Sequence, residues 1–167
     1  IPTLTSDTLS LFEKDLKERA TNLFIVDFEK EETDLFAFEK VNLHWYLKNI
    51  TRNPLTHLPD NDFIAFLRKF SADSTFQVNS ISFPLNRSFA DVDKDYETTT
   101  EIIQEKDWRF WKLTNDVNRL LILDMLQKEH RYRNIFLRGI DNGIWIKYTF
   151  ERKQDTWQLI KIEDYST

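Results

Sequence analysis

Three histidines are the first residues of this chain whose side chains could do chemistry, since an imidazole can bind a metal or act as a general base. His44, His57 and His130 lie far apart. None has a second histidine three or four residues away, the spacing that places two imidazoles on one helix face. The chain also contains no cysteine. We therefore predict no metal site and no cofactor.

Glycine-dependent catalytic and phosphate-binding motifs are excluded by composition. Gly139 and Gly143 are the only two glycines. A nucleophile elbow, a P-loop and a dinucleotide fingerprint each need at least two glycines at fixed short spacings that these positions do not provide.

Carboxylates are the remaining candidates for acid–base chemistry, which needs a carboxyl group buried so that its pKa rises towards neutrality. Asp73 follows a predicted helix, where we expect its side chain to accept hydrogen bonds from local backbone amides. Glu163 and Asp164 close the last predicted strand, and we expect both to be solvated. No carboxylate is thus assigned a catalytic role.

Composition bounds the class of protein. The chain has 167 residues, a net charge of −5, 14 Phe and 5 Trp, which indicates a packed domain rather than disorder. No run of five or six like charges is present, so nucleic acid is not an expected partner. No apolar run approaches the ~20 residues of a transmembrane helix.

Two stretches 112 positions apart predict the architecture. Residues 22–51 and 134–164 each contain three apolar-rich runs separated by turn residues, and identical residues recur at the same offset. The alternation of apolar residues favours strands, so each stretch is predicted to be an antiparallel three-stranded meander. The identical pairs include Asn22 and Asn134, Phe24 and Phe136, Phe38 and Phe150, Glu39 and Glu151, Trp45 and Trp157, and Leu47 and Leu159.

The segments between the stretches are predicted from periodicity and breakers. Residues 60–73 carry apolar side chains at i, i+3, i+4 and i+7, which predicts a helix capped by Asp60 or Asn61. The alternation in 75–85 predicts a strand that Pro84 ends, followed by a polar loop over 86–97. Residues 119–126 and, less clearly, 8–12 favour strands, and residues 141–143 favour a hairpin turn.

The helix and the closing strands carry a more specific pattern. A phenylalanine-rich helix leads into Asp73 and Gln77, then into Phe83-Pro84-Leu85, and the chain closes on Phe150, Trp157 and Leu159. These residues resemble the bacterial domain of unknown function 4348 family, which has the nuclear transport factor 2-like fold. Asp155 stands where that family has a glycine, a tolerable change in a turn.

The resemblance implies an α+β fold in which a curved antiparallel sheet wraps around an N-terminal helix to form a cone. It also implies tandem units. Residues 1–53 would be the C-terminal half of a first unit, a three-stranded meander, residues 54–59 a linker, and residues 60–167 a complete unit.

The cone of this fold often binds a small molecule, and some relatives perform acid–base chemistry there. The resemblance implies that aromatic side chains either line this pocket or fill it completely. We expect a non-catalytic module that binds a small molecule or a protein in the bacterial cell envelope, periplasmic or lipid-anchored, with a cytoplasmic location as the alternative. The alternative function is an isomerase or hydrolase with a buried carboxylate. The candidate lining residues are Phe66, Phe70, Phe83, Trp108, Trp111, Tyr148 and Phe150.

Overall fold

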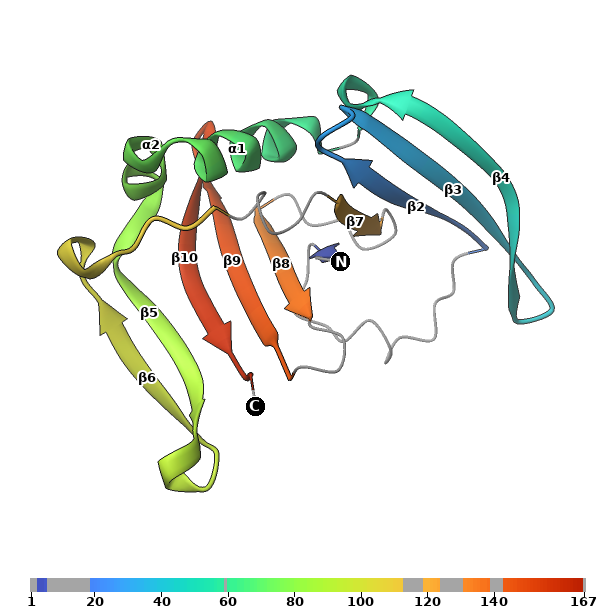
Figure 1. The fold of residues 1–167 in the computed structure, drawn as a ribbon. Coiled ribbons are helices and arrows are strands. Elements are labelled where there is room, and N and C mark those ends of the chain that lie inside the picture. The colour runs from blue at the N-terminus through green and yellow to red at the C-terminus, as the bar shows by residue number, and fades with distance from the viewer. Residues whose placement is uncertain are drawn as a thin grey trace.

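A computed structural model describes residues 3–5, 19–58, 60–112, 119–123, 131–138 and 143–166 of the chain. These residues form an α+β structure (Figure 1). Its helices are α1 (Asn61–Ala72) and α2 (Ser74–Asn79), with short 3-10 turns η1 (Leu55–His57), η2 (Val92–Lys94) and η3 (Glu105–Asp107). Its strands are β1 (Thr3–Thr5), β2 (Ala20–Asp27), β3 (Glu32–Val41), β4 (His44–Pro54), β5 (Ile81–Asp91), β6 (Glu97–Ile103), β7 (Arg119–Leu123), β8 (Tyr132–Arg138), β9 (Trp145–Lys153) and β10 (Thr156–Asp164).

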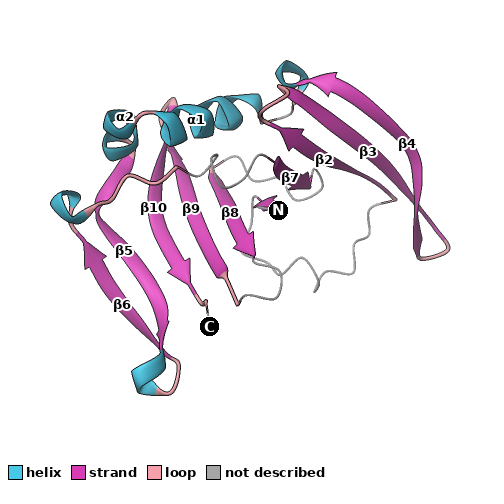
Figure 2. Ribbon diagram, viewed as in Figure 1, coloured by secondary structure: helices cyan, strands magenta, loops and turns pink. Residues whose placement is uncertain are grey.

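All the described strands belong to one curved sheet (Figure 2). The order is β4-β3-β2-β7-β1-β8-β9-β10-β5-β6. The prediction of an antiparallel sheet is wrong at two places, because β1 pairs with β7 in parallel and β10 pairs with β5 in parallel. The sequence pattern showed local hairpins, whereas both parallel pairs join strands distant in sequence.

The two predicted meanders are present and share one hydrogen-bonding register. Phe38 pairs with Leu47 in β3 and β4, as Phe150 pairs with Leu159 in β9 and β10. A shift of register lies at the same place in each pair. In the first pair it falls between Ala37 and Phe38, which face Asn49 and Leu47. In the second it falls between Leu159 and Lys161, which face Phe150 and Thr149. We refer to β2–β4 as the first meander and to β8–β10 as the second; their origin as two tandem units stays a prediction.

The two meanders turn opposite faces to the core. Helix α1 packs on the face of the second meander that carries Phe150, with Phe63 and Phe150 ring centroids 5.4 Å apart at 69°. In the first meander the buried apolar side chains are Phe24 and Val26, and Phe24 pairs with Leu35, on the opposite side of β3 from Phe38. This follows from the order of the strands, because β7 and β1 are parallel neighbours and the two meanders extend from them towards opposite edges of the sheet. Strands β2 and β8, which flank this pair, therefore run in the same direction, so one meander is turned over relative to the other.

Helix α1 forms where it was predicted, and its apolar stripe makes the centre of the core. Phe63, Ile64, Leu67 and Phe70 are almost completely buried. Asp60 is the N-cap residue of α1, one of the two positions predicted, but its carboxylate makes no cap hydrogen bond. Instead it accepts two hydrogen bonds from the buried Arg133 guanidinium, at 2.9 and 2.8 Å. The start of α1 is thereby fixed to β8.

The predicted strand over 75–85 is wrong in its first half, where the chain forms α2. The side chain of Asp73 accepts a hydrogen bond from the Phe76 amide at 2.9 Å, which caps this helix as its predicted role requires. Strand β5 then runs through Pro84 to Asp91, so the predicted loop over 86–97 is wrong up to that residue. Pro84 is tolerated because pairing with β6 begins only at Leu85 and pairing with β10 shifts between Ile81 and Asn86.

The segment predicted as a linker is packed against the rest of the chain. Leu55 and Leu58 are buried in the core cluster, and Pro54 ends β4. The division into residues 1–53 and 60–167 stays a prediction. Strand β7 confirms part of the strand predicted over 119–126, while the strand at 8–12 and the turn residues 141 and 142 lie outside the described residues.

Candidate functional site

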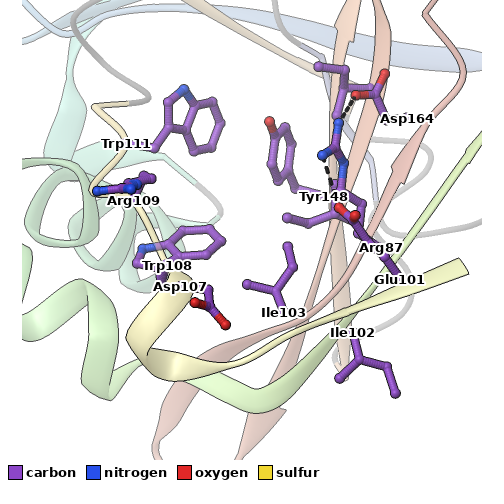
Figure 3. Close-up of a pocket in the computed structure, with 12 residues that line it drawn as sticks. Arg87, Glu101, Ile102, Ile103, Asp107, Trp108, Arg109, Trp111, Tyr148 and Asp164 are labelled. Carbon is purple, nitrogen blue, oxygen red and sulfur yellow. Dashed lines mark hydrogen bonds and ion pairs between the residues drawn. The ribbon is translucent and has the colours of Figure 1, made fainter.

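A cavity of about 490 Å³ opens between β5, β6, β9, β10 and the segment after β6 (Figure 3). This size is in the range of small-molecule sites. The side chain of Trp108 stands on one side of it and that of Arg87 on the other, while the rings of Trp111 and Tyr148 contact each other. The lining residues are Arg87, Glu101, Ile102, Ile103, Asp107, Trp108, Arg109, Trp111, Ile146, Tyr148, Ile162 and Asp164.

Aromatic rings form the apolar part of the cavity. Trp111 stacks on Tyr148 with ring centroids 4.4 Å apart and planes at 19°. Trp108 meets Phe83 edge to face at 6.2 Å. Burial, and secondarily the negative charge of Asp164, raises the pKa of the Tyr148 phenol, so this hydroxyl stays protonated and can donate a hydrogen bond at neutral pH.

Gln77, a completely buried residue of α2, fixes the positions of both tryptophans. Its side-chain nitrogen donates to the carbonyl oxygens of Phe70 at 2.9 Å and Trp111 at 2.7 Å. Its side-chain oxygen accepts from the Trp108 indole at 2.9 Å and the Trp111 amide at 3.0 Å. All four hydrogen-bonding positions of the amide are thus used, and the segment carrying the aromatic wall is tied to the helices.

Arg87 forms the charged part of the cavity. Its guanidinium donates to Asp164 at 2.8 Å and to Glu101 at 3.0 Å, bridging β10 and β6 across β5. Burial alone would raise the pKa of Asp164, but hydrogen bonds from Arg87 and Ser166 outweigh it, and the pKa lies below its usual value. An ionised carboxylate that is already paired with arginine is a weak proton acceptor.

The expectation that Glu163 and Asp164 are solvated is wrong. Each side chain is only 16% exposed, and each is ion-paired. Burial opposes ionisation of Glu163, but hydrogen bonds from Lys161 and Lys147 hold its pKa below the usual value. Only Asp164 of the two lines the cavity. Alternation along a strand places the two neighbours on opposite faces of the sheet.

The seven residues proposed from sequence divide into three that line the cavity, three that lie in the core, and Phe83, which lies beside the cavity wall. Trp108, Trp111 and Tyr148 line the cavity. Phe66, Phe70 and Phe150 pack against one another in the core instead, with the Phe70 and Phe150 ring centroids 5.6 Å apart. Phe83 lies against Trp108. That any of the seven contacts a ligand stays a prediction.

Arg87 and Asp164 were missed as partners in the cavity. Arg87 falls in the segment predicted to be a loop, and its partners lie 14 and 77 residues away. No local pattern reports such a pairing. The motif residue Gln77 was the available signal, because a glutamine between the apolar residues Phe76 and Val78 has to find hydrogen-bond partners when buried.

The described residues offer neither a cluster of metal ligands nor a membrane-spanning helix. No group of three or more His, Asp or Glu side chains there could hold a metal ion. His44 is exposed and its ring contacts the carbonyl oxygen of Asn42 at 2.9 Å. Among the same residues, no helix has the length and apolar character needed to cross a membrane.

Comparison with known proteins identifies relatives of this chain. The model of the family described as "Domain of unknown function (DUF4348)" matches residues 13–164. A crystal structure of an NTF2-like protein from Bacteroides fragilis NCTC 9343 superposes with a TM-score of 0.74 at 23% sequence identity, covering 99% of this chain and 74% of that one. This similarity shows a shared NTF2-like fold. No curated protein matches the chain.

Proposed function

The chain belongs to the DUF4348 family, a domain of unknown function, and from the geometry of its cavity we propose that it binds a small molecule without catalysing a reaction. The observation that carries this proposal is an open cavity whose aromatic wall is anchored by Gln77 and whose partly buried carboxylate, Asp164, is paired with Arg87. Such a site offers apolar contact and hydrogen bonds, and it offers no group with a pKa tuned for proton transfer.

The ligand we infer has a planar apolar body and a polar group at one end. Trp108 and Ile103 provide apolar surface for the body. Tyr148, Arg87 and Asp164 lie together at the other side of the cavity (Figure 3), where a polar group would meet both donors and an acceptor. Arg87 is paired with two carboxylates, and Asp107 and Arg109 add one charge of each sign to the lining. A lining that carries both signs favours neutral or zwitterionic ligands over highly charged ones.

Binding is tested with a panel of planar amphipathic compounds, starting with indole and its carboxamide, by ligand-observed NMR and quenching of tryptophan fluorescence. Replacement of Trp108 by Ala is expected to weaken binding at least tenfold. Trp145→Ala is the matched control, because Trp145 packs with Phe136 and Tyr165 on the other face of β9. Equal affinity of the two variants would exclude the cavity as the binding site.

The alternative of an isomerase or hydrolase is tested in the same samples. It requires Asp164 to accept a proton, so Asp164→Asn would abolish turnover of any panel compound that is consumed. Our proposal expects no compound to be consumed. A reaction that is lost in Asp164→Asn would refute the non-catalytic proposal and support the enzymatic alternative.

The setting of this module is proposed on the family resemblance alone. We infer a bacterial cell-envelope protein, periplasmic or lipid-anchored, built from tandem units of which residues 1–53 are half of the first. The shared register of the two meanders supports the tandem arrangement. Fractionation of cells expressing the full-length gene product tests the location, and recovery in the cytoplasmic fraction would refute it.

A further inference from the structure

The first meander carries an apolar face that matches, residue for residue, the face covered by α1 in the second. Phe38, Trp45, Leu47 and Ile50 occupy the positions of Phe150, Trp157, Leu159 and Ile162 at the constant offset of 112. Each pairing between strands is the same: Phe38 with Leu47 as Phe150 with Leu159, and Phe36 with Ile50 as Tyr148 with Ile162. The two faces thus present the same arrangement of Cβ positions.

The burial of the matching side chains differs sharply. Leu159 and Ile162 are 0% and 6% exposed, whereas Leu47 and Ile50 are 48% and 54% exposed. Leu47 and Ile50 belong to strand β4 at the edge of the sheet. Exposed apolar side chains gathered on one face are typical of an interaction surface.

The charges around the face also match. In the second meander Arg152 lies over the Trp157 ring at 5.6 Å and pairs with Asp62, in the first turn of α1, at 3.2 Å. In the first meander Lys40 has the position of Arg152 and lies over the Trp45 ring at 5.8 Å. A helix placed on this face as α1 is placed on the other would bring a carboxylate of its first turn near Lys40.

We propose that this face of β2–β4 docks an amphipathic α-helix supplied by the other half of the first tandem unit, so the proposal rests on the tandem arrangement inferred above. The helix carries large apolar residues at i, i+3, i+4 and i+7, as α1 does with Phe63, Phe66, Leu67 and Phe70, and an acidic residue in its first turn. The corresponding contacts of α1 define the geometry: aromatic rings of the helix meet the positions of Phe38 and Trp45 edge to face. The site is separate from the cavity and does not depend on the proposed ligand.

The probe is a lactam-stapled peptide of residues 60–73 of this chain, linked through positions 65 and 69, off the apolar stripe. The staple is needed because a helix of this length is marginal alone. Its binding to the whole chain is followed by fluorescence anisotropy. We expect saturable binding that weakens at least tenfold when Leu47 is replaced by Asp, and several-fold when the peptide carries Asp62→Asn.

Tyr46→Asp is the matched control. Tyr46 is 54% exposed, on the same strand as Leu47 but on its other face, because it pairs with Glu39. Binding unaffected by Tyr46→Asp and lost with Leu47→Asp supports the proposal. Absence of saturable binding, or binding unchanged by Leu47→Asp, overturns it. Self-association of the chain that Leu47→Asp abolishes also overturns it, because the occupant is then a second copy; sedimentation velocity measures this.

Discussion

Replacing Gln77 by leucine removes the residue that ties the aromatic wall of the cavity to the helices. Leucine has nearly the same size and keeps the side chain apolar in a completely buried position. It leaves the carbonyls of Phe70 and Trp111, the Trp111 amide and the Trp108 indole without their partner. Four hydrogen bonds at roughly 1 kcal/mol each give a loss of about 4 kcal/mol in the free energy of unfolding.

This loss is measurable in two ways. A chain of this length loses roughly 2–4 °C of Tm per kcal/mol, so the Tm is expected to fall by roughly 8–16 °C. The emission maximum of the tryptophans should also shift to the red before global unfolding, because Trp108 and Trp111 lose their anchor and become more hydrated. Urea unfolding followed by fluorescence and by circular dichroism separates the local effect from the global one.

Gln104→Leu is the control. Gln104 is exposed at the start of the segment that carries the two tryptophans, and its side chain makes no cap hydrogen bond. It should change the free energy of unfolding by less than about 0.5 kcal/mol. If Gln77→Leu and Gln104→Leu unfold at the same urea concentration, the four bonds contribute nothing and the assignment of Gln77 as a positioning residue is refuted.

Three further perturbations test the fold. Arg133→Met leaves the buried carboxylate of Asp60 unpaired and should cost about 3–5 kcal/mol, and a double variant with Asp60→Asn should recover part of this in urea unfolding; strict additivity would contradict the pairing. Phe150→Ala should cost about 3–5 kcal/mol, whereas Phe38→Ala, at the matching half-buried position, should cost about 1 kcal/mol; equal costs by thermal unfolding would contradict the different environments. The pKa of Asp164 is lower in the folded state than its ordinary value of 3.8. Its ion pair therefore stabilises the fold above pH 3.8, and this contribution is lost as the pH falls through the lower folded-state pKa. The fall of Tm with decreasing pH should lack this component in Asp164→Asn.

The strands of the two meanders could be predicted because their signals are local. Alternation fixes the face of each residue, and turn residues fix the connections. The positions of α1 and of the turn after β9 follow from equally local patterns. These elements account for the core around Phe63 and Phe150.

Helix α2 could not be predicted, because its residues from Thr75 to Asn79 alternate in polarity as a strand would. What decides its conformation is the burial of Gln77 among four distant hydrogen-bond partners. Tertiary contacts of this kind override weak local preference. The same limit applies to Arg87, whose role depends on carboxylates in β6 and β10.

Strand β1 places a constraint on the order in which the chain folds. It has three residues, yet it joins the two halves of the sheet, pairing with Leu121 and Ile122 in β7 and with Asn134, Ile135 and Phe136 in β8. The first meander can form as soon as its hairpins close. The sheet becomes continuous only when the earliest residues of this chain find partners more than a hundred positions later. Long loop closures of this kind slow folding, so we expect the joining of the halves to be the late kinetic step.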